Sequence, residues 1–202
     1  KESNHARRPF RAVKFKNESD FFLGKGKTII YNSGLFSGEC VLEPTKPTEN
    51  RMLPHCLENS VAVAKETKPV QTRRQALKIS DGVGVTEDVY TAATTYVVEN
   101  KKEEKYKMAL EHSNVLRGHA NLNVDFDGVD VKEKEKLTSN DGYRAYFELA
   151  PKQKVTLTVT ETSVSSQKQQ IGNYYPWLVA NVIETNNPLA EDKGVLACVE
   201  IQ

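Results

Sequence analysis

The sequence predicts an all-β protein, a two-sheet antiparallel β-sandwich with a C-terminal extension that ends in a strand. Three observations support this fold class. Apolar and polar residues alternate with a period of two, most clearly in residues 120–126, 143–149 and 155–159, as expected of strands with one face in a core. Turn signals separate these segments at short spacing. No segment before residue 164 has a convincing helical periodicity.

The other strands are predicted from weaker alternation or from short apolar runs. Clusters such as Asn32-Ser33-Gly34 and Asp127-Gly128 lie between them, and these residue types favour the backbone conformations of tight turns. The further predicted strands within the sandwich are residues 13–15, 28–31, 38–42, 52–57, 61–64, 77–79, 94–98 and 106–110.

The short connections between predicted strands imply antiparallel pairing, because a parallel crossover needs a dozen or more residues. About ten or eleven strands in one open sheet would leave an apolar face unburied, so two packed sheets are expected. The charged runs at residues 101–105 and 132–136 contain both Lys and Glu. They are expected to be solvated loops or hairpin tips.

The chain is expected to have three parts, an N-terminal arm (residues 1–9), the sandwich domain (10–163) and a C-terminal extension (164–202). The arm is polar and begins with Lys1, which suggests that an upstream segment was removed or that the chain is a module of a larger protein. The extension begins with a polar, linker-like stretch. An apolar stretch and a predicted final strand, residues 195–201, follow it.

The apolar residues of this extension are the predicted contacts with a partner. The extension either packs back on the sandwich and completes an edge, or adds a strand or an aromatic anchor to a neighbouring molecule. Tyrosine and tryptophan suit the second role because they bury much apolar area with few rotamers to freeze. The predicted interaction residues are Tyr174, Tyr175, Trp177, Leu178, Val179, Val195, Leu196, Val199 and Ile201.

The composition disfavours several function classes. The 202 residues include 28 Lys and Arg against 27 Asp and Glu, for a net charge of +1, which provides no electrostatic footprint for nucleic acid or an anionic membrane. No apolar run approaches the roughly 20 residues of a transmembrane helix. Residues 24–28 resemble a phosphate-binding loop, but Phe21 replaces a required glycine and a strand follows. No cofactor is expected.

Cys40 and Cys56 lie about equally far from Thr48, within a proline-rich turn. If the flanking strands form a hairpin centred there, the two cysteines face each other. Their Cβ atoms would then lie about 4.5–5.5 Å apart, slightly more than the roughly 3.5–4.5 Å of a disulfide. Both a disulfide, which would imply an oxidising compartment, and two reduced thiols are open. Cys198 makes the count odd, so at least one of the three thiols is free or pairs between molecules.

Residues 123–128 resemble the first half of a calcium loop, because oxygen ligands at alternate positions followed by a glycine can wrap a hard cation. The twelfth position, however, holds Lys134 instead of an acid. An acidic turn is the alternative interpretation. The candidate calcium ligands are Asn123, Asp125, Asp127 and Asp130.

Several short motifs occur in the order found in a known family. They are Val13-Lys14-Phe15-Lys16-Asn17, Tyr31-Asn32-Ser33-Gly34-Leu35-Phe36-Ser37-Gly38, Leu53-Pro54, Arg73-Arg74, Thr95-Tyr96-Val97-Val98-Glu99-Asn100, Glu111-His112, Tyr143-Arg144 with Phe147, and Val159-Thr160-Glu161. On these motifs, residues 10–161 resemble the C-terminal β-sandwich domain of mucoidy-inhibitor-A-type proteins, a domain of unknown function. The resemblance implies an antiparallel sandwich in a larger envelope or extracytoplasmic protein, and it carries over no catalytic residue. The charged insert after Phe126, the tail and the missing helical region depart from the family pattern.

These observations favour a non-catalytic structural or interaction module at the cell surface, self-assembling through its C-terminal segment. The expected partner is protein, as a homo-oligomer or a larger assembly. The alternative is a sandwich that binds carbohydrate or calcium, with Tyr143, Tyr146 or Trp177 stacking on a sugar. An enzyme is the third hypothesis, and it would need a cleft where a titratable pair meets, such as His112 with Glu111 or Glu161.

Overall fold

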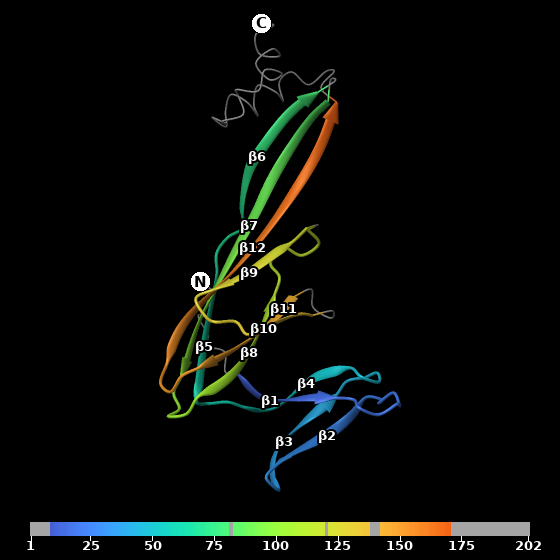
Figure 1. The fold of residues 1–202 in the computed structure, drawn as a ribbon, viewed down its shortest axis with the longest axis vertical. Helices are drawn as coiled ribbons and strands as arrows, with labels where there is room; N and C mark the ends of the chain where they lie inside the picture. The colour runs from blue at the N-terminus through green and yellow to red at the C-terminus, as the bar shows by residue number, and fades with distance from the viewer. Residues whose placement is uncertain (1–8, 81–82, 120, 138–141, 171–202) are drawn as a thin grey trace, which may run out of the picture. The chain divides into compact units, whose positions relative to one another are not determined.

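The computed structural model describes residues 9–80, 83–119, 121–137 and 142–170. Within these ranges the chain forms twelve β-strands and no helix (Figure 1), so no helix there is long and apolar enough to cross a membrane. The predicted all-β, antiparallel fold of the sandwich class is confirmed. The strands are β1 (Phe10–Lys16), β2 (Gly26–Asn32), β3 (Leu35–Leu42), β4 (Asn50–Leu57), β5 (Val61–Thr67), β6 (Gln71–Ser80), β7 (Val83–Asn100), β8 (Tyr106–Ser113), β9 (Asn123–Asp127), β10 (Glu133–Leu137), β11 (Gly142–Leu149) and β12 (Lys154–Gln170).

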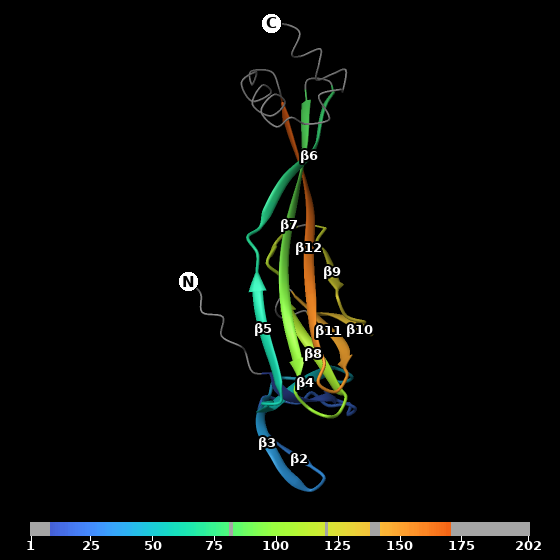
Figure 2. The ribbon, with the colours of Figure 1, turned by 90° about the vertical axis from the view of Figure 1, so that its left-hand side faces the viewer.

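The described strands form four hydrogen-bonded sheets. Two of them are two-stranded ribbons, β1–β4 and β2–β3, and a third has the order β10-β11-β8. The largest has the order β5-β7-β12-β9, with β6 also paired to β7. Its two longest strands, β7 and β12, lie side by side in both views (Figures 1 and 2).

The chain divides into two compact units, each assembled from three segments of sequence. Unit 1 comprises Lys1–Lys65, Tyr96–Met108 and Glu148–Thr156, and unit 2 comprises Glu66–Thr95, Ala109–Phe147 and Leu157–Gln202.

Unit 1 contains both ribbons. In β1–β4, Phe10 pairs with Leu57 and Lys16 with Asn50. In β2–β3, Ser33 and Gly34 connect the strands, and their φ angles of 51° and 80° are those of a two-residue hairpin turn with two left-handed positions. The turn predicted at residues 32–34 is therefore confirmed. The buried apolar side chains of this unit are Leu53, Val61, Tyr96, Val98, Met108 and Leu149.

Unit 2 is organised by the alternation that the sequence shows. Along β7 the buried positions recur at every second residue over most of the strand, and β12 pairs with β9 from Thr158 opposite Asp127 to Thr162 opposite Asn123. One face of each strand therefore supplies the core. The buried apolar side chains of this unit are Ala92, Leu110, Leu116, Val124, Ala145, Phe147, Leu157 and Val159.

Two predicted boundaries differ from the structure. Residues 164–170, expected to be a linker, are the last part of β12. They were missed because their sequence is polar, whereas the strand is defined by backbone hydrogen bonds. The strand predicted to begin at residue 120 begins at Asn123. Asn121 has a φ of 54°, a left-handed conformation that an extended strand does not accommodate.

Candidate functional site

One face of the β2–β3 ribbon is open to solvent and carries four large apolar side chains together with charged ones. Tyr31 pairs with Phe36 across the strands, and their rings meet edge to face with centroids 6.4 Å apart. Their exposed fractions are 64 % and 65 %, and Ile29 and Val41 on the same face are 50 % and 53 % exposed. We call Ile29, Tyr31, Phe36 and Val41, with the charged residues described next, the outer face of the ribbon.

The charged residues of the outer face are separated by strand. Lys27 belongs to β2 and Glu39 to β3, and the Lys27 Nζ lies 2.7 Å from the Glu39 carboxylate. Just beyond the strand ends, Lys25 and Glu43 form a second ion pair at 2.9 Å. All four side chains are more than half exposed. The β2 side of the face is therefore basic and the β3 side is acidic.

The inner face of the ribbon is half-buried and includes Thr28, Ile30, Cys40 and Leu42. Gly38 lies on this face with a φ of 147°, and a Cβ there would be 2.3 Å from the carbonyl oxygen of His55 in β4. Only glycine allows this close backbone approach. The ribbon is thus held against β4 on one face, which leaves the outer face uncovered.

Glu58, 1 % exposed, connects several segments of unit 1 through hydrogen bonds. Its Oε2 accepts hydrogen bonds from Arg11 Nε at 2.8 Å, Lys102 Nζ at 2.9 Å and the Tyr106 hydroxyl at 3.1 Å. Its Oε1 accepts one from the Ser60 backbone N–H at 2.9 Å. One carboxylate therefore connects β1, the residues after β4 and both sides of the β7–β8 turn.

These donors determine the ionisation of the cluster. Burial by itself would raise the pKa of Glu58, but the hydrogen bonds from Lys102, Ser60, Arg11 and Tyr106 outweigh it and lower the pKa to about 2. Burial and the bond to Glu58 raise the pKa of Tyr106 to about 12. The Glu58 carboxylate is therefore ionised and the Tyr106 phenol is neutral at physiological pH, so the carboxylate can accept the hydrogen bond that the phenol donates.

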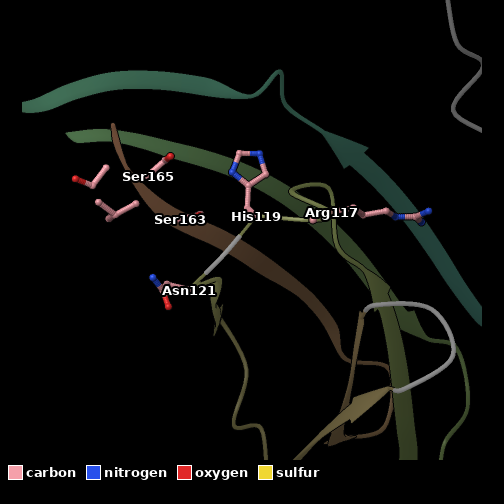
Figure 3. Close-up of a pocket in the computed structure, with 8 residues that line it drawn as sticks. Arg117, His119, Asn121, Ser163 and Ser165 are labelled. Carbon is pink, nitrogen blue, oxygen red and sulfur yellow. The ribbon is translucent and has the colours of Figure 1, made fainter. Parts of the chain in front are cut away.

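Unit 2 carries a surface pocket of about 450 Å³. It lies between β12 and the segment that follows β8, and Figure 3 shows Ser163 and Ser165 on one side, with His119 and Asn121 on the other. The Arg117 side chain points away from the serines (Figure 3). Hydroxyl, amide and imidazole groups of this kind can hydrogen-bond a polar ligand.

His112 and Glu161 do meet, but both are fully buried. The His112 Nε2 lies 2.8 Å from the Glu161 carboxylate, which also accepts hydrogen bonds from the backbone N–H groups of Val115 and Leu116. Burial would raise the pKa of Glu161, but the bonds from His112, Val115 and Leu116 lower it. Neither residue lines the pocket. Because Glu161 accepts hydrogen bonds from Val115 and Leu116, the pair connects β12 to the segment after β8.

The hairpin on which the Cys40–Cys56 disulfide alternative depended does not form. β3, which carries Cys40, pairs with β2, whereas β4, which carries Cys56, pairs with β1. The two-residue turn at Ser33-Gly34 closes the β2–β3 pair locally, which competes with the longer proline-containing connection. Cys40 and Cys56 are both free thiols. Cys198 lies outside the described residues.

The calcium candidates do not converge. Asn123, Asp125 and Asp127 occupy alternate positions of β9, and the Asn123 amide donates a hydrogen bond to the Asp125 carboxylate at 2.9 Å. Among the described residues no group of three or more His, Cys, Asp or Glu side chains, Asp130 included, could hold a metal ion.

Tyr143 and Tyr146, the tyrosines expected to stack on a sugar, are half-buried and contact neighbouring side chains. The Lys134 ammonium lies 4.8 Å from the centre of the Tyr143 ring, and the Tyr146 hydroxyl donates to Glu135 at 3.1 Å. Trp177 and the other predicted interaction residues of the C-terminal extension lie outside the described residues.

The sequence contained a signal for the outer face that hydrophobicity alone does not isolate. The Ser33-Gly34 turn accounts for the pairing of Tyr31 with Phe36. A register shift next to Ile30 then places Ile29 and Val41 on the same face as these two rings, and the turn alone does not predict that shift. Nothing in the sequence, however, shows that this face lacks a covering strand.

Comparison with protein-family models, with curated proteins and with solved structures finds no match to this chain. The resemblance to the mucoidy-inhibitor-A-type domain therefore stays a prediction from short motifs.

Proposed function

We propose that this chain is a non-catalytic interaction module that assembles with further copies of itself or into a larger protein assembly. The observation that carries the proposal is the outer face of the β2–β3 ribbon, where four large apolar side chains are each at least half exposed. Large apolar side chains that gather on one open face are a candidate contact with a partner. A two-stranded ribbon also gains stability when a further layer covers it.

The C-terminal residues Tyr174, Tyr175 and Trp177 and the predicted strand 195–201 provide the second contact region of this proposal. Their support is the sequence, since aromatic and β-branched residues in that density are suited to anchoring and strand addition. A location in the cell envelope or outside the cell belongs to the same proposal. It rests on the family resemblance.

The experiment is light scattering of the full chain and of a chain ending at Gln170, each over a dilution series. The end point is Gln170 because residues 164–170 belong to β12. We expect the full chain to form a defined oligomer and the shortened chain to associate more weakly. A full chain that stays monomeric throughout the series would overturn the proposal.

Binding of a small polar ligand such as a carbohydrate is a second candidate function, favoured by the pocket of unit 2. Its lining includes the hydrogen-bonding side chains of His119, Asn121, Ser165 and Ser166. A thermal-shift screen with soluble glycans should then show stabilisation in the full chain, and Ser165→Val should remove it. Equal responses of the two proteins, or no response from either, would reject this function.

A further inference from the structure

The outer face of the β2–β3 ribbon is complementary to itself. Its lysines, Lys25 and Lys27, lie on the β2 side, and its glutamates, Glu39 and Glu43, lie on the β3 side. We propose that a second copy of this chain docks its own β2–β3 ribbon on this face, related by a two-fold axis parallel to the strands. This inference rests on the proposed function, self-association, and identifies the surface and its geometry.

The symmetry follows from the charge arrangement. When two ribbons face each other across a two-fold axis parallel to their strands, β2 of each copy lies over β3 of the other. Positions along the strands are kept, so Lys25 of each copy lies over Glu43 of its partner, and Lys27 lies over Val41, one diagonal step from Glu39. Both contacts occur twice, as in any isologous contact. An axis perpendicular to the strands would place β2 over β2 and reverse the strand direction, so that the charged end of each copy would lie over the aromatic end of the other.

The same arrangement covers the apolar residues. Tyr31 of one copy lies over Phe36 of the other, because these two residues pair across the ribbon, and the aromatic rings of the two copies form one cluster. Ile29 lies opposite Glu39 and Val41 opposite Lys27, so the rest of the face mixes aliphatic and charged side chains. The contact therefore has an aromatic end next to the Ser33-Gly34 turn and a charged end at Lys25 and Glu43.

The area of the outer face is too small for a stable interface by itself. Strands of seven and eight residues rise about 3.3 Å per residue and lie about 4.8 Å apart, so the face measures about 250 Å². A standard interface buries about 800 Å² per partner. The ribbon contact therefore adds to another contact between the copies through effective concentration, and it has to be tested in the full chain.

The test is a charge swap. One variant of the full chain carries Lys25→Glu and Lys27→Glu, which makes the outer face acidic, and the other carries Glu39→Lys and Glu43→Lys, which makes it basic. Each variant alone should self-associate at least about tenfold more weakly than the wild type in sedimentation equilibrium, because like charges then meet in the contact. A 1:1 mixture of the two should regain association, since an acidic face meets a basic one.

Both variants also lose exposed ion pairs within the ribbon, which are worth about 0–1 kcal/mol each. The matched control is another exposed pair of unit 1, Lys152 and Glu103, 2.9 Å apart, reversed as Lys152→Glu and Glu103→Lys. These two proteins should associate like the wild type, alone and mixed. Circular dichroism checks the fold of every variant.

Should a charge-swapped chain fail to fold, Ile29→Lys keeps all four charged residues and places a further charge next to the aromatic pair. It should weaken self-association by at least about tenfold. If the full chain associates but the acidic, basic and Ile29→Lys variants associate equally well, the ribbon contact is wrong while the proposed function stands. If the wild-type chain never associates, the proposed function itself has failed.

Discussion

At the scale of single residues, two buried carboxylates stabilise the described structure by gathering donors from distant parts of the chain. Glu58 binds Arg11, Lys102 and Tyr106, which lie 44 to 48 positions away. Glu161 reaches His112, 49 positions away. A buried charge with this many hydrogen bonds is compensated for its lost hydration, and removing it leaves several donors unpaired.

Replacing Glu58 with Gln should lower the free energy of unfolding by about 2–4 kcal/mol at neutral pH, because the charged donors lose their counterion. The pKa of Glu58 is lowered from 4.5 to about 2 in the folded chain. Its contribution is therefore complete above about pH 5 and disappears as the pH falls toward 2, where the carboxylate becomes protonated in both states. Urea denaturation at several pH values measures both effects.

The control for this variant is Glu103→Gln, because Glu103 is 81 % exposed and pairs with a lysine that is also exposed. It should change stability by less than about 1 kcal/mol. If Glu58→Gln and Glu103→Gln have the same denaturation midpoints, the hydrogen bonds to Glu58 do not stabilise the fold.

Gly38 gives a second residue-scale prediction. A Cβ at this position would lie 2.3 Å from the His55 carbonyl oxygen, and the φ of 147° is one that side chains rarely adopt. Gly38→Ala should therefore loosen β3 from β4 and cost at least about 2 kcal/mol. Gly24→Ala is the matched control, since nothing lies within 4 Å of its Cβ position. Thermal melts of the two variants that coincide would contradict the close packing.

At the scale of elements, the period-two pattern predicted most strands but not their lengths. β7 was predicted only in part, at residues 94–98, because its first half is rich in polar residues, yet it runs from Val83 to Asn100. The charged run 132–136 was predicted to be a solvated loop or hairpin tip, but all of it except Lys132 belongs to β10 (Glu133–Leu137), which pairs with β11. In both segments, backbone hydrogen bonds stabilise a strand that contributes little to a core, and hydrophobicity does not report such bonds.

The ribbon pairing was predictable in one case and not in the other. The Ser33-Gly34 turn predicts β2–β3 from local sequence alone. The β1–β4 pair joins residues 34 to 47 positions apart, and no local signal chooses it over a β3–β4 hairpin. The hydrogen-bond partners of Glu58 and Glu161 could not be predicted for the same reason, because they depend on which strands become neighbours.

The segment after β8 is the element that Glu161 controls. Replacing Glu161 with Gln removes the charge and leaves one acceptor oxygen, where the carboxylate now accepts hydrogen bonds from His112 and from the backbone N–H groups of Val115 and Leu116. The exchange protection of these two amides should fall by at least about tenfold, since local opening becomes easier. Hydrogen exchange measured residue by residue checks this. Glu111→Gln, on an exposed carboxylate that pairs with Arg144, should leave both amides protected.

At the scale of the whole molecule, the sequence predicted the fold class because alternation recurs throughout residues 10–161, and a class needs no knowledge of strand order. It did not predict the division into two units, because each unit is assembled from three separate segments. The outer face of the ribbon is a property of the same scale. A strand becomes an interaction surface when no other part of its unit covers it, and only the assembled unit determines that.

The end of β12 separates two truncations that the sequence alone treats as equivalent. A chain ending at Ser163 lacks the last seven residues of β12, the strand that lies between β7 and β9. Removing them exposes backbone N–H and C=O groups of the neighbouring strand, and such open edges promote aggregation. A chain ending at Gln170 retains the whole strand.

We expect the chain ending at Ser163 to melt several degrees lower and to aggregate, as measured by calorimetry and light scattering. The chain ending at Gln170 should keep its unfolding transition. Identical melting of the two chains would mean that residues 164–170 add nothing to the sheet, and the boundary at 163 would be the better description of the domain.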